Sequence, residues 1–261
     1  MNILDEILKE KRIEVDERKE LFPVKLLEKS IYFDTPVVSM KEYLQRDGAS
    51  GIIAEFKRKS PSKGDINKYA DLEEVTRGYM QAGASALSVL TDKKYFGGEN
   101  KDLTIVRKFN FCPVLRKDFI IDEYQVFEAK SIGADVILLI AEALGKEDVK
   151  NLASIAKSLG MEVLLEVHSR DQLSKLNDYI DIVGINNRNL KTFEVSIENS
   201  KAISKYLPEG FMKISESGIN ETEDVLELRN YGFSGFLIGE RFMKTPHPAQ
   251  ACKSFIDGLN N

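Results

Sequence analysis

Short apolar runs recur along the chain after about residue 50, separated by longer segments in which apolar residues follow a helical period. Nearly continuous runs of Val, Ile, Leu and Ala are typical of strands buried on both faces. The intervals leave room for a helix and two loops. We predict strands at 51–56, 86–90, 112–116, 135–140, 162–167, 181–186, 211–215 and 235–239. Eight strand–helix units indicate an α/β fold, the (β/α)8 or TIM barrel.

The segments between the predicted strands have helical spacing and recognisable stops. Val149, Leu152 and Ala156 fall on one helical face, and Gly160 follows as a stop. Further back, Asp122 with Gln125 predicts a capping box. A glycine precedes a strand at Gly83-Ala84, Gly133-Ala134 and Gly232-Phe233. This weak repeat is consistent with one strand–helix unit copied around a barrel.

The first 48 residues do not follow this alternation. An apolar stripe that begins at Ile3 lies on a highly charged helix, which we expect to run to about Leu21. A second helix is expected after Ser39 as N-cap, with Glu42 three residues on and Gly48 at its end. We divide the chain into an N-terminal helical extension, 1–48, and a catalytic barrel, 49–261. The pattern leaves open whether the extension plugs the barrel bottom or covers its active face.

Polar residues at the ends of five predicted strands share one phase. Because side chains alternate along a strand, residues two apart point the same way. The sets are Ile53/Glu55/Lys57, Leu115/Lys117, Leu164/Glu166, Gly184/Asn186/Arg188 and Ile214/Glu216. Single charges of this kind are often ordinary rim residues, but agreement over five strands favours a common cleft at the carboxyl ends, where such barrels carry their chemistry. Phe56, Arg58 and Lys213 have the opposite phase, and we expect them to pack, to lie at the rim or to point outward.

Glycines close the last two strands. Ser217-Gly218-Ile219 and Ile238-Gly239-Glu240 each precede a helical segment, where bare backbone N–H groups can approach an anion. Each glycine alone is more often a plain turn residue. Their joint occurrence indicates a phosphate site.

Composition narrows the classes of function. The chain is 43% hydrophobic and 30% charged, and it has no apolar stretch near the roughly 20 residues that cross a bilayer. The first residues lack the pattern of a signal peptide, so we expect a cytoplasmic protein without a membrane partner. A net charge of −5 disfavours nucleic acid. Within this acidic chain, two local groups of cations favour a small anion as ligand: the residues at 57–59 and 63, and the pair Arg116 and Lys117.

Cysteine and histidine are scarce. Cys112 and Cys252 lie far apart without CxxC spacing, which favours two reduced thiols. With His168 and His247 as the only histidines, we expect no metal site. Catalysis then falls to Lys, Glu, Asp, Asn, Ser and Arg.

Taken together, the motifs resemble the indole-3-glycerol phosphate synthase family. The similar segments are Ala54-Glu55-Phe56-Lys57-Arg58-Lys59-Ser60-Pro61-Ser62, Ser88-Val89-Leu90-Thr91-Asp92, Pro113-Val114-Leu115-Arg116-Lys117-Asp118-Phe119, Leu165-Glu166-Val167-His168, Gly184-Ile185-Asn186-Asn187-Arg188, Ser215-Glu216-Ser217-Gly218-Ile219 and Ile238-Gly239-Glu240. They span nearly the whole barrel in order. The resemblance implies ring closure of 1-(2-carboxyphenylamino)-1-deoxyribulose 5-phosphate, with loss of carbon dioxide and water, in tryptophan biosynthesis. It implies a phosphorylated small-molecule substrate and no metal or organic cofactor; we expect a monomer or weak homo-oligomer.

The resemblance also implies roles for individual residues. Lys117 is the expected general acid, with a pKa lowered by a crowded cationic mouth, and Glu166 the general base or the acid of the dehydration. Lys57 is expected to pair with a substrate anion or donate a second proton, and Glu55 to orient it. The sugar hydroxyls are expected to contact Asn186 and Glu216, and Arg188 is expected to order the site by its charge. The phosphate is expected to bind Ser217, Gly218, Gly239 and Glu240, and the aromatic ring to lie against Phe96, Phe119 and Leu138. Ser60 is expected in a loop over the substrate. Which lysine acts at which step is left open.

Two positions depart from the family pattern, and three other functions remain in competition. Arg241 stands where the family tends to have a small residue, and Asn189 where an aspartate is common. A phosphoribosylanthranilate isomerase would need a cysteine at the end of the first strand, where this chain has Glu55 and Lys57. A Schiff-base aldolase would use Lys117 as nucleophile. A barrel without catalysis would not need polar residues in phase at strand ends.

Overall fold

The computed structural model describes residues 3–189 and 194–259, and its centre is a closed barrel of parallel strands. The strands adjoin in the order β1-β10-β9-β8-β7-β6-β5-β4. Their bounds are β1 Ile52–Phe56, β4 Ala86–Leu90, β5 Val114–Lys117, β6 Val136–Ile140, β7 Glu162–Val167, β8 Ile182–Asn186, β9 Met212–Glu216 and β10 Gly235–Ile238. All eight predicted strands are confirmed, with ends shifted by no more than two residues. A hairpin of β2 (Lys59–Ser60) and β3 (Gly64–Asp65) follows β1.

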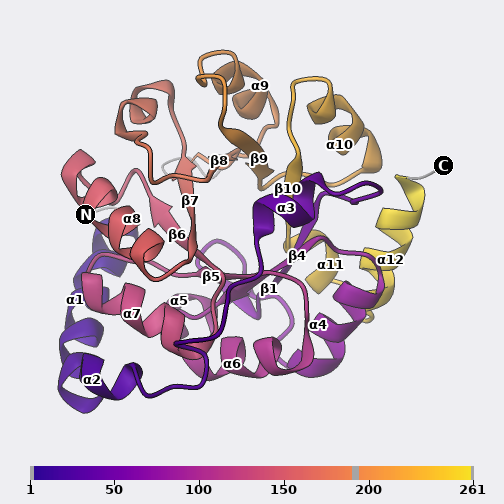
Figure 1. The fold of residues 1–261 in the computed structure, drawn as a ribbon. Coiled ribbons are helices and arrows are strands. Elements are labelled where there is room, and N and C mark those ends of the chain that lie inside the picture. Colours follow the sequence, from indigo (N-terminus) through magenta and orange to yellow (C-terminus); the bar gives the residue numbers. More distant parts are fainter. Residues whose placement is uncertain (1–2, 190–193, 260–261) are drawn as a thin grey trace.

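Helices surround the barrel (Figure 1). Their bounds are α1 Ile3–Leu21, α2 Val24–Leu27, α3 Met40–Gln45, α4 Leu72–Gln81, α5 Lys93–Phe96, α6 Asn100–Phe109, α7 Glu123–Ile132, α8 Lys146–Ser158, the 3-10 helix η1 Arg170–Lys175, α9 Glu198–Ser204, α10 Thr222–Arg229, α11 Glu240–Met243 and α12 Pro248–Gly258. In Figure 1 the indigo helices α1 and α2 lie beside α7, and the yellow C-terminal α12 lies beside α4, which completes the ring.

The helix caps predicted from the sequence are present. Asp122 and Gln125 form the capping box of α7, and Gly133 ends that helix with a φ of 94°, in the left-handed region that favours glycine. The Ser39 side chain accepts a hydrogen bond from the backbone N–H of Glu42, as expected for an N-cap. One expected end is wrong. Helix α3 stops at Gln45, because Arg46 is already extended, and Gly48 lies in the turn beyond it.

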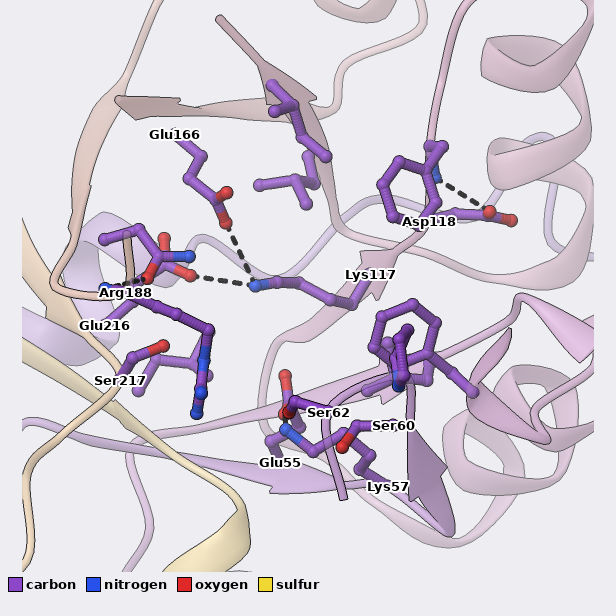
Figure 2. Close-up of a pocket in the computed structure, with 18 of the residues that line it drawn as sticks. Glu55, Lys57, Ser60, Ser62, Lys117, Asp118, Glu166, Arg188, Glu216 and Ser217 are labelled. Carbon is purple, nitrogen blue, oxygen red and sulfur yellow. Dashed lines mark hydrogen bonds and ion pairs between the residues drawn. The ribbon is translucent and has the colours of Figure 1, made fainter. Parts of the chain in front are cut away.

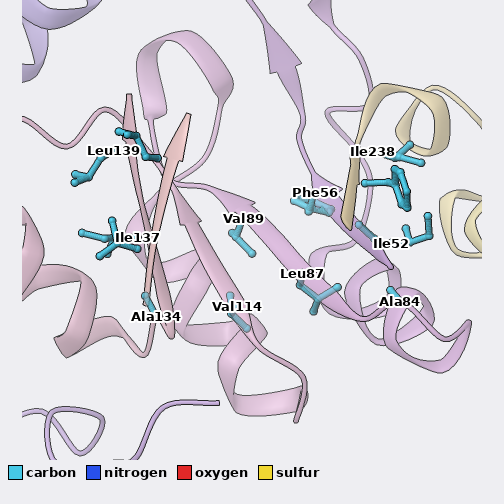
Figure 3. Packing of buried hydrophobic residues seen from close by; sticks show 14 of the residues in the cluster. Ile52, Phe56, Ala84, Leu87, Val89, Val114, Ala134, Ile137, Leu139 and Ile238 are labelled. Carbon is cyan, nitrogen blue, oxygen red and sulfur yellow. The ribbon is translucent and has the colours of Figure 1, made fainter. Parts of the chain in front are cut away.

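Alternation along the strands divides the apolar residues into two clusters. The residues that face into the barrel form one cluster: Ile53, Ala86, Leu115, Val136, Leu138, Ile140, Leu164, Ile182, Met212, Ile214 and Leu237. The outward residues pack against the helices; Figure 3 shows Ile52, Leu87, Val89 and Ile137 among them. Ile53, Leu115, Leu164 and Ile214 were predicted to fill the barrel below the strand ends, and their place in the inner cluster confirms that phase.

The extension occupies both ends of the barrel, so each of the two placements left open by the sequence is correct for one of its helices. Helix α3 closes the bottom. Met40 and Leu44 belong to the inner cluster, and the backbone N–H of Met40 donates to Glu162, the first residue of β7, at 2.7 Å. Helix α1 lies at the other end, where Leu4 and Ile7 line the cavity above the strands.

Lys11 fixes α1 on this upper face. Its side chain is only 1% exposed, and its Nζ lies 2.9 Å from Asp92 Oδ2 and 3.0 Å from Asp118 Oδ1. Asp92 follows β4 and Asp118 follows β5, so the ammonium joins the helix to the ends of two neighbouring strands. Burial opposes the charge, but the two aspartates and Glu14 raise the pKa of Lys11 above its usual value. The helix is therefore held by a buried ion pair as well as by apolar contacts.

Replacing Lys11 with Met should lower the free energy of unfolding by about 3 kcal/mol, because it leaves the buried carboxylates without their shared cation. Urea denaturation followed by circular dichroism measures this change. Lys9→Met makes the same replacement on the exposed face of α1 and should shift stability by no more than about 0.5 kcal/mol. Equal effects of the two replacements would contradict a special role for Lys11.

The Lys11 contribution should also depend on pH. Burial raises the pKa of Asp118, but Lys11 and Arg116 outweigh it and hold that pKa well below its usual value, so its stabilisation is present above pH about 4 and is lost as pH falls further. The raised pKa of Lys11 gives a contribution that is complete below pH about 10 and is lost above it. The stability difference between the wild type and Lys11→Met should therefore be flat between pH about 5 and 9 and shrink in acid.

Candidate active site

A cavity opens at the carboxyl ends of the barrel strands, roofed in part by Leu4 and Ile7 of α1. Of the residues predicted from the sequence, it is lined by Glu55, Lys57, Ser60, Phe96, Lys117, Phe119, Leu138, Glu166, Asn186, Arg188, Glu216, Ser217 and Glu240. The two remaining predicted residues, Gly218 and Gly239, line an adjoining hollow. The structure thus brings all fifteen together, although they come from eight strands and the loops that follow.

Lys117 lies at the centre of this cavity between two buried carboxylates. Its Nζ is 2.8 Å from Glu216 Oε2 and 3.2 Å from Glu166 Oε2 (Figure 2). The three side chains leave the ends of β5, β7 and β9, and the apolar inner cluster lies directly below them. The inward phase of three separate strands therefore brings an ammonium group and two carboxylates within hydrogen-bond distance.

The charges of this cluster determine the protonation states. Burial lowers the pKa of Lys117, but Glu216, Glu166 and Glu55 outweigh it and raise the pKa above its usual value. The lowered pKa expected for Lys117 is wrong, because its neighbours are carboxylates and not other cations. Burial raises the pKa of Glu166, yet Lys117 and then His168 bring it below the usual range. For Glu216 burial prevails over Lys117, and Glu166 adds to it, so its pKa is raised.

A second ion pair stands at the end of β1. Lys57 Nζ lies 2.7 Å from Glu55 Oε1, and the Ser88 hydroxyl from β4 donates to Glu55 Oε2 at 3.2 Å. Burial alone would raise the pKa of Glu55, but Lys57 and Lys117 lower it. Glu55 therefore stays ionised and holds the Lys57 ammonium at the cavity wall, as predicted from their shared phase.

The residues on either side of Lys117 belong to other networks. Arg116 is fully buried outside the barrel, where it contacts Glu128 at 2.6 Å and Asp118 at 3.1 Å. The expectation that Arg116 and Lys117 form a joint cation site is wrong, because alternation sends them to opposite faces of β5. Arg58 also turns away, to Asp102, and stacks over Phe56, as its phase predicted.

Two aromatic rings form one wall of the cavity. Phe96 and Phe119 have ring centroids 6.0 Å apart, and Leu138 of β6 lies among the other lining residues. Phe96 ends the short helix α5, which begins with Asp92 accepting from the backbone N–H of Tyr95 at 2.8 Å. This wall gives the cavity an apolar side opposite its charged one, suited to a flat aromatic group.

The adjoining hollow is built from the ends of β9 and β10. Ser217 has a φ of 67°, the one positive φ outside glycine among residues 3–189 and 194–259, and Gly218 follows with 74°. Arg188 and Lys63 approach Glu240 at 3.9 and 3.8 Å along its edge. Backbone strain at Ser217 costs about 1 kcal/mol, and such strain concentrates at ligand sites.

Asn186 and Asn187 take opposite directions at the end of β8. The Asn186 amide oxygen accepts from the backbone N–H of Arg188 at 2.9 Å, which fixes the amide at the cavity wall. The buried Asn187 amide donates to Ser215 Oγ at 2.9 Å and to the Ser217 carbonyl at 3.0 Å. Asn187 therefore holds the loop that carries Ser217.

Sequence reasoning missed several residues on which this geometry depends. Lys11, Asn187 and Gly184 were not given a role, and neither was His168, whose Nε2 lies 3.4 Å from Glu166 Oε1. The signal for His168 was present, because it shares the phase of Glu166 on β7. Contacts across the fold placed the others, so a strand-by-strand pattern could not find them.

The two cysteines take no part in the site. Cys112 and Cys252 are buried free thiols, as predicted. Burial raises the pKa of Cys112 to about 11 and that of Cys252 to about 12, so both remain protonated and unreactive near neutral pH. None of the described helices is both long and apolar enough to cross a membrane.

Comparison with known proteins gives a consistent result over the whole chain. A family model described as "Indole-3-glycerol phosphate synthase" matches residues 4–255. A protein of that name from Bacteroides thetaiotaomicron is 50% identical over 258 residues, which cover 99% of each chain. Another from Thermoanaerobacter pseudethanolicus is 43% identical over 255 residues, covering 97% of each, and one from Campylobacter fetus is 41% identical, covering 93% of this chain and 94% of its own.

Solved structures support the fold independently. The tryptophan synthase alpha subunit of Legionella pneumophila superimposes with a TM-score of 0.61 at 14% identity, over 84% of this chain and 96% of its own. A mutant alpha subunit from Pyrococcus furiosus gives a TM-score of 0.60 at 13% identity, over 81% and 98%. At this identity the likeness concerns the barrel fold alone.

Proposed function

The chain belongs to the indole-3-glycerol phosphate synthase family, and we propose that Lys117 and Glu166 carry proton transfers of its reaction, with Glu216 beside them at the sugar hydroxyls. That reaction converts 1-(2-carboxyphenylamino)-1-deoxyribulose 5-phosphate to indole-3-glycerol phosphate with release of carbon dioxide and water, a decarboxylating step of tryptophan biosynthesis. The observation that carries the proposal is the Lys117 ammonium group between two buried carboxylates in a cavity with one apolar wall.

The cavity can receive each part of this substrate. The anthranilate ring lies against Phe96, Phe119 and Leu138, and its carboxylate meets Lys57. At the other end the phosphate occupies the hollow of Ser217, Gly218, Gly239 and Glu240, where backbone N–H groups and nearby cations favour an anion. Asn186 and Glu216 hold the sugar hydroxyls between these ends, Arg188 orders the site by its charge, and Ser60 contributes from the end of β2. Arg241 donates to the Asn220 carbonyl at 2.9 Å, which keeps it at the edge of the hollow.

In the condensation, Lys117 is the general acid. The ring carbon that bears the carboxylate attacks the ribulose carbonyl carbon, and Lys117 gives a proton to the carbonyl oxygen as the C–C bond forms. The bond to the carboxylate then breaks, carbon dioxide leaves, and the electron pair restores the aromatic ring and the anilino nitrogen. Glu55 stabilises the positive charge that develops on that nitrogen between these two steps.

In the dehydration, the new hydroxyl leaves as water after it receives a proton, and a neighbouring CH2 group loses a proton to form the indole double bond. Glu166 is the base, since its lowered pKa keeps it ionised. Lys117 and Lys57 are the candidate donors to the leaving hydroxyl. Two protons are thus donated and one is accepted, so a turnover that starts from the ionised carboxylate takes up one proton from solution.

The Schiff-base alternative does not suit this cavity. A lysine that forms a Schiff base must be neutral when it attacks a carbonyl, and such lysines have lowered pKa values. The carboxylates around Lys117 raise its pKa instead. The end of β1 bears Glu55 and Lys57 where the isomerase alternative requires a cysteine.

We also propose a cytoplasmic protein that acts as a monomer or weak homo-oligomer, with residues 1–48 as an extension and 49–261 as the catalytic domain. The free buried thiols of Cys112 and Cys252 suit a reducing compartment. The cavity takes its lining from α1 as well as from the barrel of the same chain, so it is assembled within one copy.

Gly184 makes room for the central cluster. A Cβ atom built on this residue would lie 2.1 Å from Glu216 Oε1 and 3.1 Å from Leu164 Cδ1. Any side chain at this position on β8 therefore displaces the carboxylate of Glu216, which contacts Lys117 at 2.8 Å. A glycine here supports the proposed role, because it lets a carboxylate extend across the neighbouring strand.

The direct test is to mix the protein with the carboxyphenylamino-deoxyribulose phosphate and follow indole fluorescence. The chain has no tryptophan, so the product signal stands on a low background. Replacing Lys117 with Ala should lower kcat by about 100- to 10,000-fold while circular dichroism shows an intact fold. Lys150→Ala, an exposed lysine of α8, should retain normal kcat. A near-normal rate in Lys117→Ala would remove it as the acid, and no turnover by folded wild type would refute the proposal.

Gly184→Ala should lower kcat/KM by about 100-fold, because a displacement of about 1 Å in a catalytic group has effects of that size. The added methyl group should also lower the free energy of unfolding by about 1 to 3 kcal/mol. Gly145→Ala is the matched control, since Gly145 is exposed at the start of α8 and its added Cβ meets only the Asp148 side chain, at 3.0 Å. Unchanged turnover in Gly184→Ala would show that the position of Glu216 is not critical.

A further inference from the structure

His168 has a contact with the proposed base that the mechanism above does not use. The residue follows β7, two positions after Glu166, and its Nε2 lies 3.4 Å from Glu166 Oε1. This is the carboxylate oxygen that does not bind Lys117, which contacts Oε2. Glu166 therefore lies between an ammonium group on one side and an imidazole on the other.

The imidazole is held in place by its backbone while its ring makes no hydrogen bond. The His168 N–H donates to Gln172 Oε1 at 2.7 Å, and its carbonyl accepts from the Asn199 amide at 3.3 Å. Within the part of the chain that the structure describes, neither ring nitrogen has a hydrogen-bond partner, although both are shielded from solvent. A buried polar group left in this way costs about 1 to 3 kcal/mol, so its retention requires an explanation.

The charge balance of the reaction supplies a reason for a titratable group at this position. As derived above, each turnover consumes one proton, because two are donated and one is accepted. The substrate cavity is closed in part by α1, and the cluster of Lys117, Glu166 and Glu216 is buried. His168 touches that cluster from outside the cavity, and the residue borders a separate hollow that includes the exposed Ser169 and Glu142.

We propose that His168 is the proton partner of Glu166, a positioning residue that hydrogen-bonds Oε1 and supplies the proton that the cluster consumes in each turnover. The Nε2–H bond breaks, the proton moves to the Glu166 carboxylate and from there to Lys117, and the neutral imidazole is reprotonated from the side of the adjoining hollow. This inference rests on the proposed role of Glu166. The slightly long contact fits such a partner, because catalytic hydrogen bonds often tighten only when substrate is bound.

The charges that face the imidazole are compatible with this role. Glu166 approaches from its own strand, Glu142 from the loop after β6, and Arg188 and Glu194 from the segments that follow β8. Three of these four groups are acidic, so the charge that surrounds the imidazole is mostly negative. His168 in turn helps Lys117 to keep the pKa of Glu166 below its usual range, against the effect of burial.

The test compares His168→Gln, which keeps an amide donor but cannot titrate, with His168→Ala, which leaves space for added imidazole. We expect kcat to fall about 10- to 100-fold in both, the range for partners of catalytic groups, with KM changed less than about 3-fold. If His168 donates in its protonated form, wild-type kcat should fall as pH rises, and this limb of the pH profile should vanish in His168→Gln, which cannot titrate. Free imidazole should restore His168→Ala in proportion to its protonated fraction.

His247→Ala is the matched control, because His247 is exposed ahead of α12 and borders neither hollow. His247→Ala should have wild-type kcat and the same fall of kcat with rising pH, and added imidazole should not change its rate. Persistence of the pH limb in His168→Gln, or wild-type kcat in His168→Ala, would overturn the inference. Glu166→Gln separates the two hypotheses. If it is inactive while the His168 variants are normal, only the inference fails; if it is as active as wild type, the proposed role of Glu166 fails as well.

Discussion

The contact of one ammonium group with two buried carboxylates determines much of this molecule. Lys117 and Glu166 carry charge into a region where burial opposes it, and burial raises the pKa of Glu216 beside them. A buried ion pair of this kind adds little net stability compared with well-packed apolar residues. Other features of the fold make this contact possible. The absence of a side chain at Gly184 leaves room for the Glu216 carboxylate. The inner apolar cluster fixes the strands from which Lys117, Glu166 and Glu216 project. A cluster retained at such cost is better explained by chemistry than by folding.

Strand β5 shows how one segment can serve the site, the core and the extension at once. Arg116, Lys117 and Asp118 are consecutive, yet they reach the outer ion-pair network, the cavity and the Lys11 anchor of α1. Because Arg116 contacts Glu128 of α7 and Asp118 contacts Lys11 of α1, the backbone on both sides of Lys117 is fixed. The position of Lys117 therefore depends on contacts outside the cavity, including those of a helix that forms part of its roof.

Alternation along strands made the inward-facing residues predictable, and contacts between elements made the rest unpredictable. Glu55, Lys117 and Glu166 could be placed in one cleft because the period of a strand is local and the barrel repeats it. Arg116 was counted among the cations that favour a small anion because its charge was considered apart from its phase, and it lies outside the barrel. Lys11 was not assigned at all, since a lysine on a charged helix gives no sign that two aspartates, about a hundred residues away, will bury it. The raised pKa of Lys117 has the same origin, because its carboxylate neighbours come from β7 and β9.

The protonation states of the cluster bear on how the proposed reaction begins. General acid and base catalysis is most effective when the pKa values lie near the working pH, yet Lys117 is raised and Glu166 is lowered away from it. Against the effect of burial, Glu216 and then Glu166 raise the pKa of Lys117, and Lys117 lowers the pKa of Glu166. A substrate carbonyl placed against Lys117 must compete with Glu166 and Glu216 for its N–H groups. If the carbonyl displaces Glu166 from Lys117, the pKa of Lys117 falls and that of Glu166 rises, so on the proposed roles substrate binding itself moves the acid and the base toward the working pH.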